Sequence, residues 1–97
     1  MISLPIDSHL PAILDGIAAH PNFVLQASPG SGKTTRLPPA ILKATWFGNG
    51  ELWVLEPRRL AAKWAANRIA EELGERAGET VGYQFRWEKA VGPKTRL

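Results

Sequence analysis

Apolar residues recur along the chain at two spacings, one typical of helices and the other of buried strands. The helical spacing of three or four positions occurs first at Leu10, Ile13, Leu14 and Ile17. It predicts a helix from about Leu10 to His20, ended by Pro21-Asn22, with Asp7 or Ser8 as a suitable N-cap. We expect this helix to pack on the strand that follows it.

Two further helices are predicted downstream. The first covers residues 33–46, with a kink or an early break at Pro38-Pro39, because neither proline can donate a helical backbone hydrogen bond. The second covers residues 58–73 and has the clearest pattern in the chain, with Gly74 placed to end it. Small side chains dominate its apolar face and would allow close approach to a sheet. That face comprises Ala61, Ala62, Ala65, Ala66, Ile69, Ala70 and Leu73.

Three short runs predict strands. Phe23-Val24-Leu25 and Leu52-Trp53-Val54-Leu55 are continuous and apolar, whereas residues 80–85 alternate between apolar and polar. The tail over residues 86–97 is charged and weakly patterned. Helices that alternate with strands in this order are typical of an α/β fold, in which flanking helices cover a parallel sheet in three αβα layers.

Composition narrows the class of protein. A chain of 97 residues can form one small domain, and its 44% hydrophobic and 22% charged residues are those of an ordinary globular protein. The absence of cysteine excludes a disulfide framework and a thiolate metal site, and His9 and His20 are too isolated to form a zinc set. We find no membrane-spanning run and no leader pattern, so we expect a cytoplasmic protein. A net charge of +3 favours polyanions without proving one.

A glycine-rich loop over residues 27–35 joins the first expected strand to the second expected helix. It matches the GxxxxGK[ST] pattern, with alanine in place of the first glycine. Gly30 and Gly32 can adopt positive φ, which lets backbone N–H groups close around phosphate oxygens. Lys33 would reach the β and γ phosphates of a nucleotide, and the Thr34 hydroxyl would take one position on Mg²⁺. The residues predicted to contact the nucleotide or its metal are Pro29, Gly30, Ser31, Gly32, Lys33, Thr34 and Thr35.

The alternative interpretation of this loop is a glycine-rich turn that contains a lysine by chance. The preceding apolar run favours the phosphate site, because the strand, loop, helix order is what a phosphate cradle requires.

Four stretches together resemble the start of a superfamily 2 helicase of the DEAH/RHA group, and within it the bacterial HrpB-type ATP-dependent helicases. These stretches are Leu4-Pro5-Ile6, residues 27–35, residues 56–62 and residues 81–88. Two departures are mild: Trp87 stands where the group usually has phenylalanine, and Pro38-Pro39 are doubled where one proline is typical. The resemblance implies that residues 1–97 form the N-terminal part of the first RecA-like ATP-binding domain, an incomplete P-loop NTPase fold.

The resemblance also implies a nucleic-acid contact. Pro57, Arg58 and Arg59 look like motif Ia, which in the group lies along the backbone of a single-stranded nucleic acid, with RNA favoured over DNA. Two guanidinium groups beside a helix N-terminus can bind a phosphodiester without reading bases. The alternative is that both arginines pair with carboxylates such as Glu56 or Glu88.

One more residue takes its expected role from the resemblance alone. Arg68 falls where the group has the arginine that stacks on the nucleotide base, whereas the sequence by itself would make it a solvated helix residue. For Arg86 and Glu88 the sequence suggests no role.

In such helicases the carboxylates that hold Mg²⁺ and polarise water, and the second RecA-like domain, lie beyond the position of Leu97. We therefore expect the chain alone to bind ATP weakly without turnover, and to self-associate through unpaired strand edges. A stand-alone nucleotide- or phosphate-binding module without hydrolysis is the second hypothesis. A small-molecule kinase is the third, although Pro57-Arg58-Arg59 would have no role in one.

Overall fold

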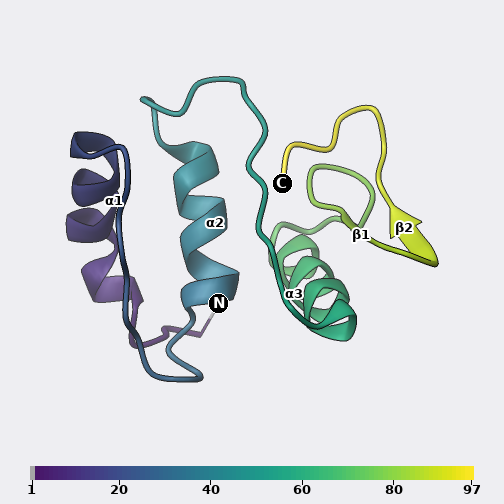
Figure 1. Ribbon diagram of the computed structural model, residues 1–97, viewed down its shortest axis with the longest axis horizontal. Helices are drawn as coiled ribbons and strands as arrows, with labels where there is room; N and C mark the ends of the chain where they lie inside the picture. Colours follow the sequence, from purple (N-terminus) through teal and green to yellow (C-terminus); the bar gives the residue numbers. More distant parts are fainter. Residues whose placement is uncertain (1) are drawn as a thin grey trace. The chain divides into compact units, whose positions relative to one another are not determined.

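The computed structural model describes residues 2–97, which divide into two compact units, Met1–Gly48 and Asn49–Leu97 (Figure 1). The elements in chain order are the 3-10 helix η1 (Asp7–His9), the helices α1 (Leu10–Ala19), α2 (Lys33–Lys43) and α3 (Arg59–Glu72), and the strands β1 (Tyr83–Phe85) and β2 (Glu88–Ala90). Within residues 2–97, none of the helices combines the length and the apolar character that crossing a membrane requires.

Helix α1 confirms the first predicted helix to within one residue at its end, where His20 adopts an extended conformation. The predicted cap is wrong, because neither Asp7 nor Ser8 makes a capping bond to α1, which starts after η1 with His9 as its N-cap residue. The Asp7 carboxylate is already engaged, since its Oδ2 accepts the backbone N–H of Leu4 at 2.8 Å.

Helix α2 begins at Lys33 as predicted and ends at Lys43, earlier than expected. It runs through Pro38 and Pro39, so the predicted early break is wrong. Each proline removes one backbone hydrogen bond, but its fixed φ is compatible with a helix. Burial of the Pro38 ring offsets part of that loss.

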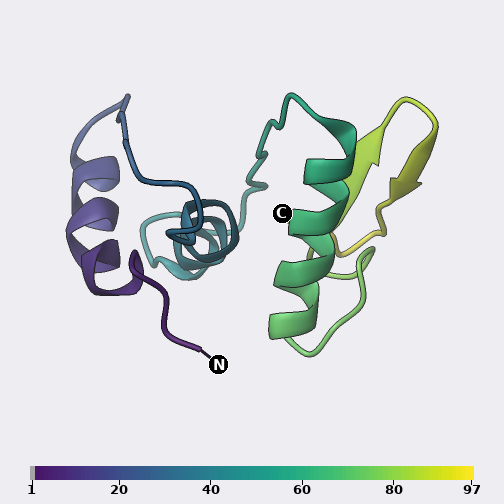
Figure 2. The same cartoon turned by 90° about the horizontal axis from the view of Figure 1, so that it is seen from below.

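The first expected strand, Phe23-Val24-Leu25, is not a strand. It runs between α1 and α2 (Figures 1 and 2), and the Phe23 ring packs so closely on Gly16 of α1 that a Cβ there would lie 2.4 Å from Phe23 Cε2. The expected packing on α1 is therefore present. A strand also needs a partner ladder, and no described residue pairs with this run.

In the second unit, α3 confirms the predicted helix and is one residue shorter at each end. Gly74 ends it with φ 73°. The Gly74 N–H donates to the carbonyl of Glu71 at 3.0 Å, and the Glu75 N–H donates to that of Ala70 at 2.8 Å. These two bonds form a Schellman motif, which satisfies carbonyls at the helix end.

The predicted parallel sheet is absent from residues 2–97. The sheet found there has two strands, with β1 antiparallel to β2 and Gln84 opposite Lys89. The expected strand over residues 52–55 carries no ladder, and the Leu52 N–H reaches only the carbonyl of Arg96, at 2.7 Å. The expected strand over residues 80–85 shortens to β1, and β2 lies in the tail where no element was predicted.

The core of the second unit lies where α3 faces β1 (Figure 2). Its buried residues are Ala66, Ile69, Ala70 and Val81, and Leu73, Tyr83 and Leu97 pack against them. Two of the four buried side chains are alanines, so the helix can approach the strand closely, as the small side chains of its apolar face predicted.

Large apolar side chains remain exposed in both units. Val24 is 93% exposed and Leu55 is 85% exposed, although both belong to continuous apolar runs. Apolar chain segments with unpaired backbone groups favour pairing with another chain.

We therefore expect the 97-residue chain to self-associate, and the double substitution Val24→Lys and Leu55→Lys to shift it toward the monomer. Light scattering over a dilution series measures this. Ile2→Lys is the control, since Ile2 is 76% exposed but lies outside the apolar runs. A monodisperse wild-type monomer at every concentration would contradict the prediction.

Candidate functional site

The glycine-rich loop turns directly into α2. Gly30 and Gly32 lie at φ 81° and 100°, in the left-handed region that favours glycine, and Gly32 is the N-cap residue of α2. The expected positive φ at these two positions is therefore confirmed. The role of the loop in binding phosphate stays a prediction at this point.

Backbone N–H groups at the start of α2 are open to a ligand. The Ser31 N–H closes the turn by donating to the carbonyl of Ser28 at 3.1 Å, and the first helical bond runs from the Arg36 N–H to the carbonyl of Gly32 at 2.8 Å. The N–H groups of residues 32–35 find no acceptor within the described part of the chain. N–H groups without an acceptor and the positive end of the helix dipole favour an anion here.

Three side chains of the loop and of the first turn of α2 were predicted to contact the nucleotide or its metal. Lys33 Nζ donates to the carbonyl of Ala27 at 3.1 Å, which folds the exposed lysine back across the loop. Ser31 Oγ is buried without a hydrogen-bond partner. Thr34 lies in the first turn of α2 and is half-buried.

The side chains of the described residues could hold Mg²⁺ only together with ligands from outside the chain. The described residues contain no group of three side chains able to hold a metal ion. Thr34 could therefore supply one oxygen, while bound phosphate oxygens and water would supply others.

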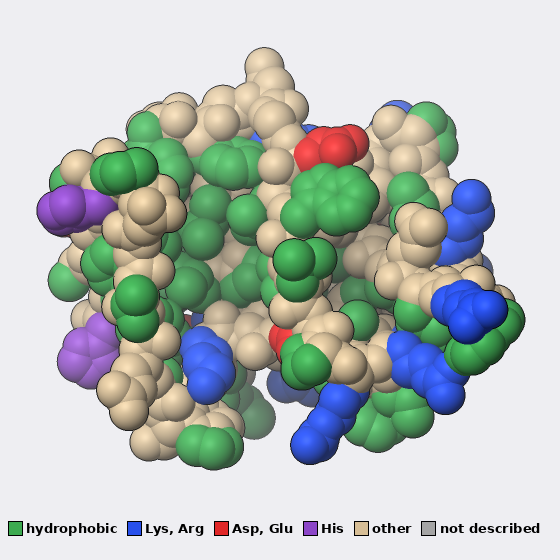
Figure 3. Space-filling model, in the orientation of Figure 1, with side chains coloured by type: hydrophobic (Ala, Val, Ile, Leu, Met, Phe, Trp, Pro, Cys, Tyr) green, Lys and Arg blue, Asp and Glu red, His purple; other side chains and the backbone are tan. Residues whose placement is uncertain are grey.

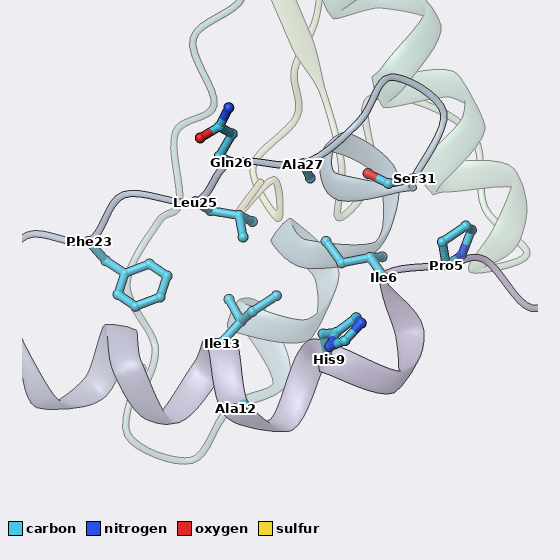
Figure 4. Close-up of a pocket in the computed structure, with 10 residues that line it drawn as sticks. All are labelled: Pro5, Ile6, His9, Ala12, Ile13, Phe23, Leu25, Gln26, Ala27 and Ser31. Atoms are coloured by element: carbon cyan, nitrogen blue, oxygen red, sulfur yellow. The ribbon is translucent and has the colours of Figure 1, made fainter.

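An apolar cavity of about 490 Å³ lies beside the loop (Figure 4). Ile6 and Ile13 face Leu25 across it, with Phe23 at one end and Ser31 at the other. The sequence reasoning missed this cavity, because it forms only where η1 and α1 meet a segment that lacks strand partners. Its apolar walls do not suit phosphate, which the N–H groups of the neighbouring loop do suit.

The predicted nucleic-acid contacts Pro57, Arg58 and Arg59 lie at the start of α3, in the second unit. Arg58 is the N-cap residue of α3 and Arg59 its first residue, and both are exposed. The Arg59 guanidinium lies 4.8 Å from the ring centre of Trp87. Neither arginine forms an ion pair with a carboxylate of the described residues.

Glu88 is occupied by other partners. Its Oε2 lies 2.7 Å from Lys63 Nζ and also accepts the Tyr83 hydroxyl. The Lys63 hydrogen bond and then that of Tyr83 hold the pKa of Glu88 below its usual range. The same carboxylate raises the pKa values of Lys63 and Tyr83, chiefly through its hydrogen bonds. The alternative interpretation, that both arginines pair with carboxylates such as Glu56 or Glu88, finds no support among the described residues, because no ion pair there includes Arg58 or Arg59.

Cations gather on the second unit. On the face shown in Figure 3, blue side chains lie mainly over the unit that holds α3, β1 and β2. The Arg86 guanidinium lies 5.1 Å from the ring centre of Trp87, which is 69% exposed. A cationic surface with an exposed aromatic ring suits a polyanion.

Arg68 occupies an exposed position on α3. Its Nε pairs with Glu72 Oε2 at 3.0 Å, one helical turn away. This contact is what a solvated helix residue makes. Its stacking on a nucleotide base stays a prediction.

The comparisons with known proteins identify relatives over the whole chain. No family model matches it. It is 46% identical over 97 residues to the ATP-dependent RNA helicase HrpB of Escherichia coli (strain K12), covering 100% of this chain and 12% of that protein. It is 37% identical over 95 residues to the ATP-dependent RNA helicase DHX33 of Drosophila melanogaster, covering 98% of this chain and 14% of that protein. The crystal structure of the Escherichia coli DEAH/RHA helicase HrpB matches at 46% identity with a TM-score of 0.90, covering 98% of this chain and 12% of that one.

The chain is homologous to DEAH/RHA helicases. It spans about an eighth of the length of the HrpB protein that it matches, at 12%. Because the match to the DEAH/RHA helicase structure covers 98% of the chain, it includes the runs over residues 23–25 and 52–55. With a TM-score of 0.90, the structural match shows that the fold of this chain resembles part of that helicase.

In this DEAH/RHA homologue Tyr83 is the single tyrosine, so its ionisation can be followed alone. Glu88→Gln replaces the charged acceptor of the Tyr83 hydroxyl with a neutral one, so we expect the pKa of Tyr83 to fall toward its ordinary value near 10.0. Tyrosinate absorbance during an alkaline titration of the 97-residue chain measures this. The control Glu71→Gln alters an exposed carboxylate of α3 and should leave the titration unchanged. An identical titration in Glu88→Gln would contradict the contact.

Proposed function

We propose that the chain is the N-terminal part of the first RecA-like domain of an ATP-dependent RNA helicase, in which the glycine loop binds the phosphates of ATP. The observation that carries this proposal is the loop itself, with two positive-φ glycines and a row of N–H groups that no described residue accepts. The relatives support it, since HrpB and DHX33 are both described as ATP-dependent RNA helicases.

The N–H groups at the start of α2 and three side chains, Lys33, Thr34 and Arg68, each have a physical role in this proposal. The N–H groups of residues 32–35 bind β-phosphate oxygens, and Lys33 exchanges its bond to the Ala27 carbonyl for one to the β and γ phosphates. The Thr34 hydroxyl supplies one ligand of the nucleotide's Mg²⁺, which would neutralise charge on the phosphates. Arg68 would break its ion pair with Glu72 and stack on the nucleotide base.

The second unit would bind the RNA. Arg58 and Arg59 carry guanidinium groups without carboxylate partners among residues 2–97, beside the N-terminus of α3. Together with Pro57 they would lie along the phosphodiester backbone of a single strand, where phosphate contacts position a chain without reading its sequence. In the complete domain, the runs over residues 23–25 and 52–55 would become parallel strands once neighbouring strands pair with them.

The first test concerns the nucleotide. We expect the 97-residue chain to bind ATP weakly and not to hydrolyse it, because the loop supplies a cradle but no carboxylate to orient water. Calorimetry and phosphate release measure the two properties. Lys33→Ala should abolish binding, whereas Lys43→Ala in the last turn of α2 should not. Phosphate release that persists after repurification and disappears in Lys33→Ala would show that the catalytic parts are present.

The second test concerns the nucleic acid. In the protein at its natural length, Arg58→Ala with Arg59→Ala should weaken single-stranded RNA binding for all base sequences. It should also make the slope of log K against log salt concentration less steep, by about 0.7 for each lost phosphate contact. Filter binding over a salt series measures this, with the exposed Arg76→Ala as the matched control. An unchanged slope in the double variant would mean that these arginines do not contact phosphate.

A further inference from the structure

The glycine loop is held from one side by the segment Leu4–Asp7, which precedes α1. The Ile6 N–H donates to the carbonyl of Ser31 at 3.0 Å. A Cβ on Gly32 would lie 2.8 Å from Leu4 Cδ1 and 3.2 Å from Ile6 Cγ2, so both side chains press directly on the Gly32 backbone. Ile6 is 4% exposed, and this contact is therefore part of the core of the first unit.

An ion pair closes the same segment onto α2. The Arg36 Nη1 donates to Asp7 Oδ2 at 2.6 Å, across 29 positions of sequence, and Nη2 donates to the carbonyl of Ile2. The same carboxylate oxygen accepts the Leu4 N–H at 2.8 Å. The Leu4 bond and then Arg36 lower the pKa of Asp7. The side chains of Arg36 and Asp7 are 10% and 28% exposed, so the pair is partly shielded from water and is screened less than a surface pair.

Arg36 also belongs to the loop's own turn, because its N–H makes the first helical bond, to the Gly32 carbonyl. One residue therefore connects Asp7 with the point where the loop becomes α2. We propose that Asp7 and Arg36 are positioning residues that hold the Leu4–Asp7 segment against Ser31 and Gly32, so that the loop is shaped for a nucleotide phosphate before one binds. This inference rests on the proposed nucleotide function of the loop.

The physical basis is pre-organisation. An exposed glycine-rich loop can adopt many conformations, and ordering it on binding would cost conformational entropy. The backbone bond between Ile6 and Ser31, together with the apolar contacts on Gly32, removes much of that freedom in advance. Asp7 and Arg36 touch no phosphate themselves, so their effect on a ligand passes through Ser31 and Gly32.

The experiment uses the protein at its natural length, with ADP as the probe. Asp7→Asn and Arg36→Met should each weaken ADP binding roughly fivefold or more. The double variant should bind no more weakly than Arg36→Met alone, because both changes remove the Asp7–Arg36 pair and Arg36→Met also removes the bond to the Ile2 carbonyl. Arg36→Lys, which retains the charge, should restore part of the affinity. Asp15→Asn is the matched control, since it makes the same chemical change at an exposed position of α1.

Hydrogen exchange without nucleotide supplies the second readout. In Asp7→Asn the hydrogen-bonded amides of Ile6, Ser31 and Arg36 should exchange faster, while those of α1 and α3 keep their wild-type rates. Wild-type loop exchange in Asp7→Asn, or wild-type ADP affinity in both single variants, would overturn the inference. Equal acceleration in the loop and α1, with an affinity loss that matches the unfolded fraction, would also overturn it, since the pair would then stabilise the whole unit.

The same measurements separate this inference from the proposed function. If the wild type and Lys33→Ala both fail to bind ADP, the proposed function is wrong. Loop exchange in Asp7→Asn then still decides whether the ion pair shapes the loop.

Discussion

The lack of a side chain at Gly32 is the constraint on which the first unit depends. Its φ of 100° suits glycine alone among the common residues, and the space that a Cβ would need is filled by Leu4 and Ile6. Gly32 therefore meets two requirements. Its backbone must adopt the positive φ that starts α2, and it must leave room for Leu4 and Ile6 to pack against it. A larger residue would strain the turn and displace Leu4 and Ile6 together, so the shape of the loop and the core beneath it cannot vary independently.

The parts of the fold that the sequence predicted well form through interactions between residues close together in the sequence. Helices α1 and α3 matched to within one residue at their ends, apart from the missing side-chain cap of α1, because helical bonds link residues four positions apart. The positive φ values of the loop followed from the glycines themselves. Arg59 and its neighbours lie at a helix N-terminus for the same local reason.

The parts that the sequence could not predict depend on distant partners. The run Phe23-Val24-Leu25 has strand composition, but a ladder requires a second strand, and residues 2–97 provide none for it. Strand β2 has the unremarkable sequence Glu88-Lys89-Ala90 and forms because a tight turn brings it onto β1. The ion pair between Asp7 and Arg36 joins positions too far apart for any local pattern to indicate.

The distribution of charge in the second unit explains why its arginines suit a polyanion. Glu88 could have neutralised Arg59, yet Lys63 and Tyr83 occupy its carboxylate, and Arg59 lies over Trp87 instead. A phosphate that approached Arg58 or Arg59 would therefore displace water and counterions and would not have to break an ion pair. Counterion release makes such binding favourable at low salt and strongly dependent on salt concentration. The Lys63–Glu88 pair thus leaves the positive charge at the start of α3 available, although it contacts neither Arg58 nor Arg59.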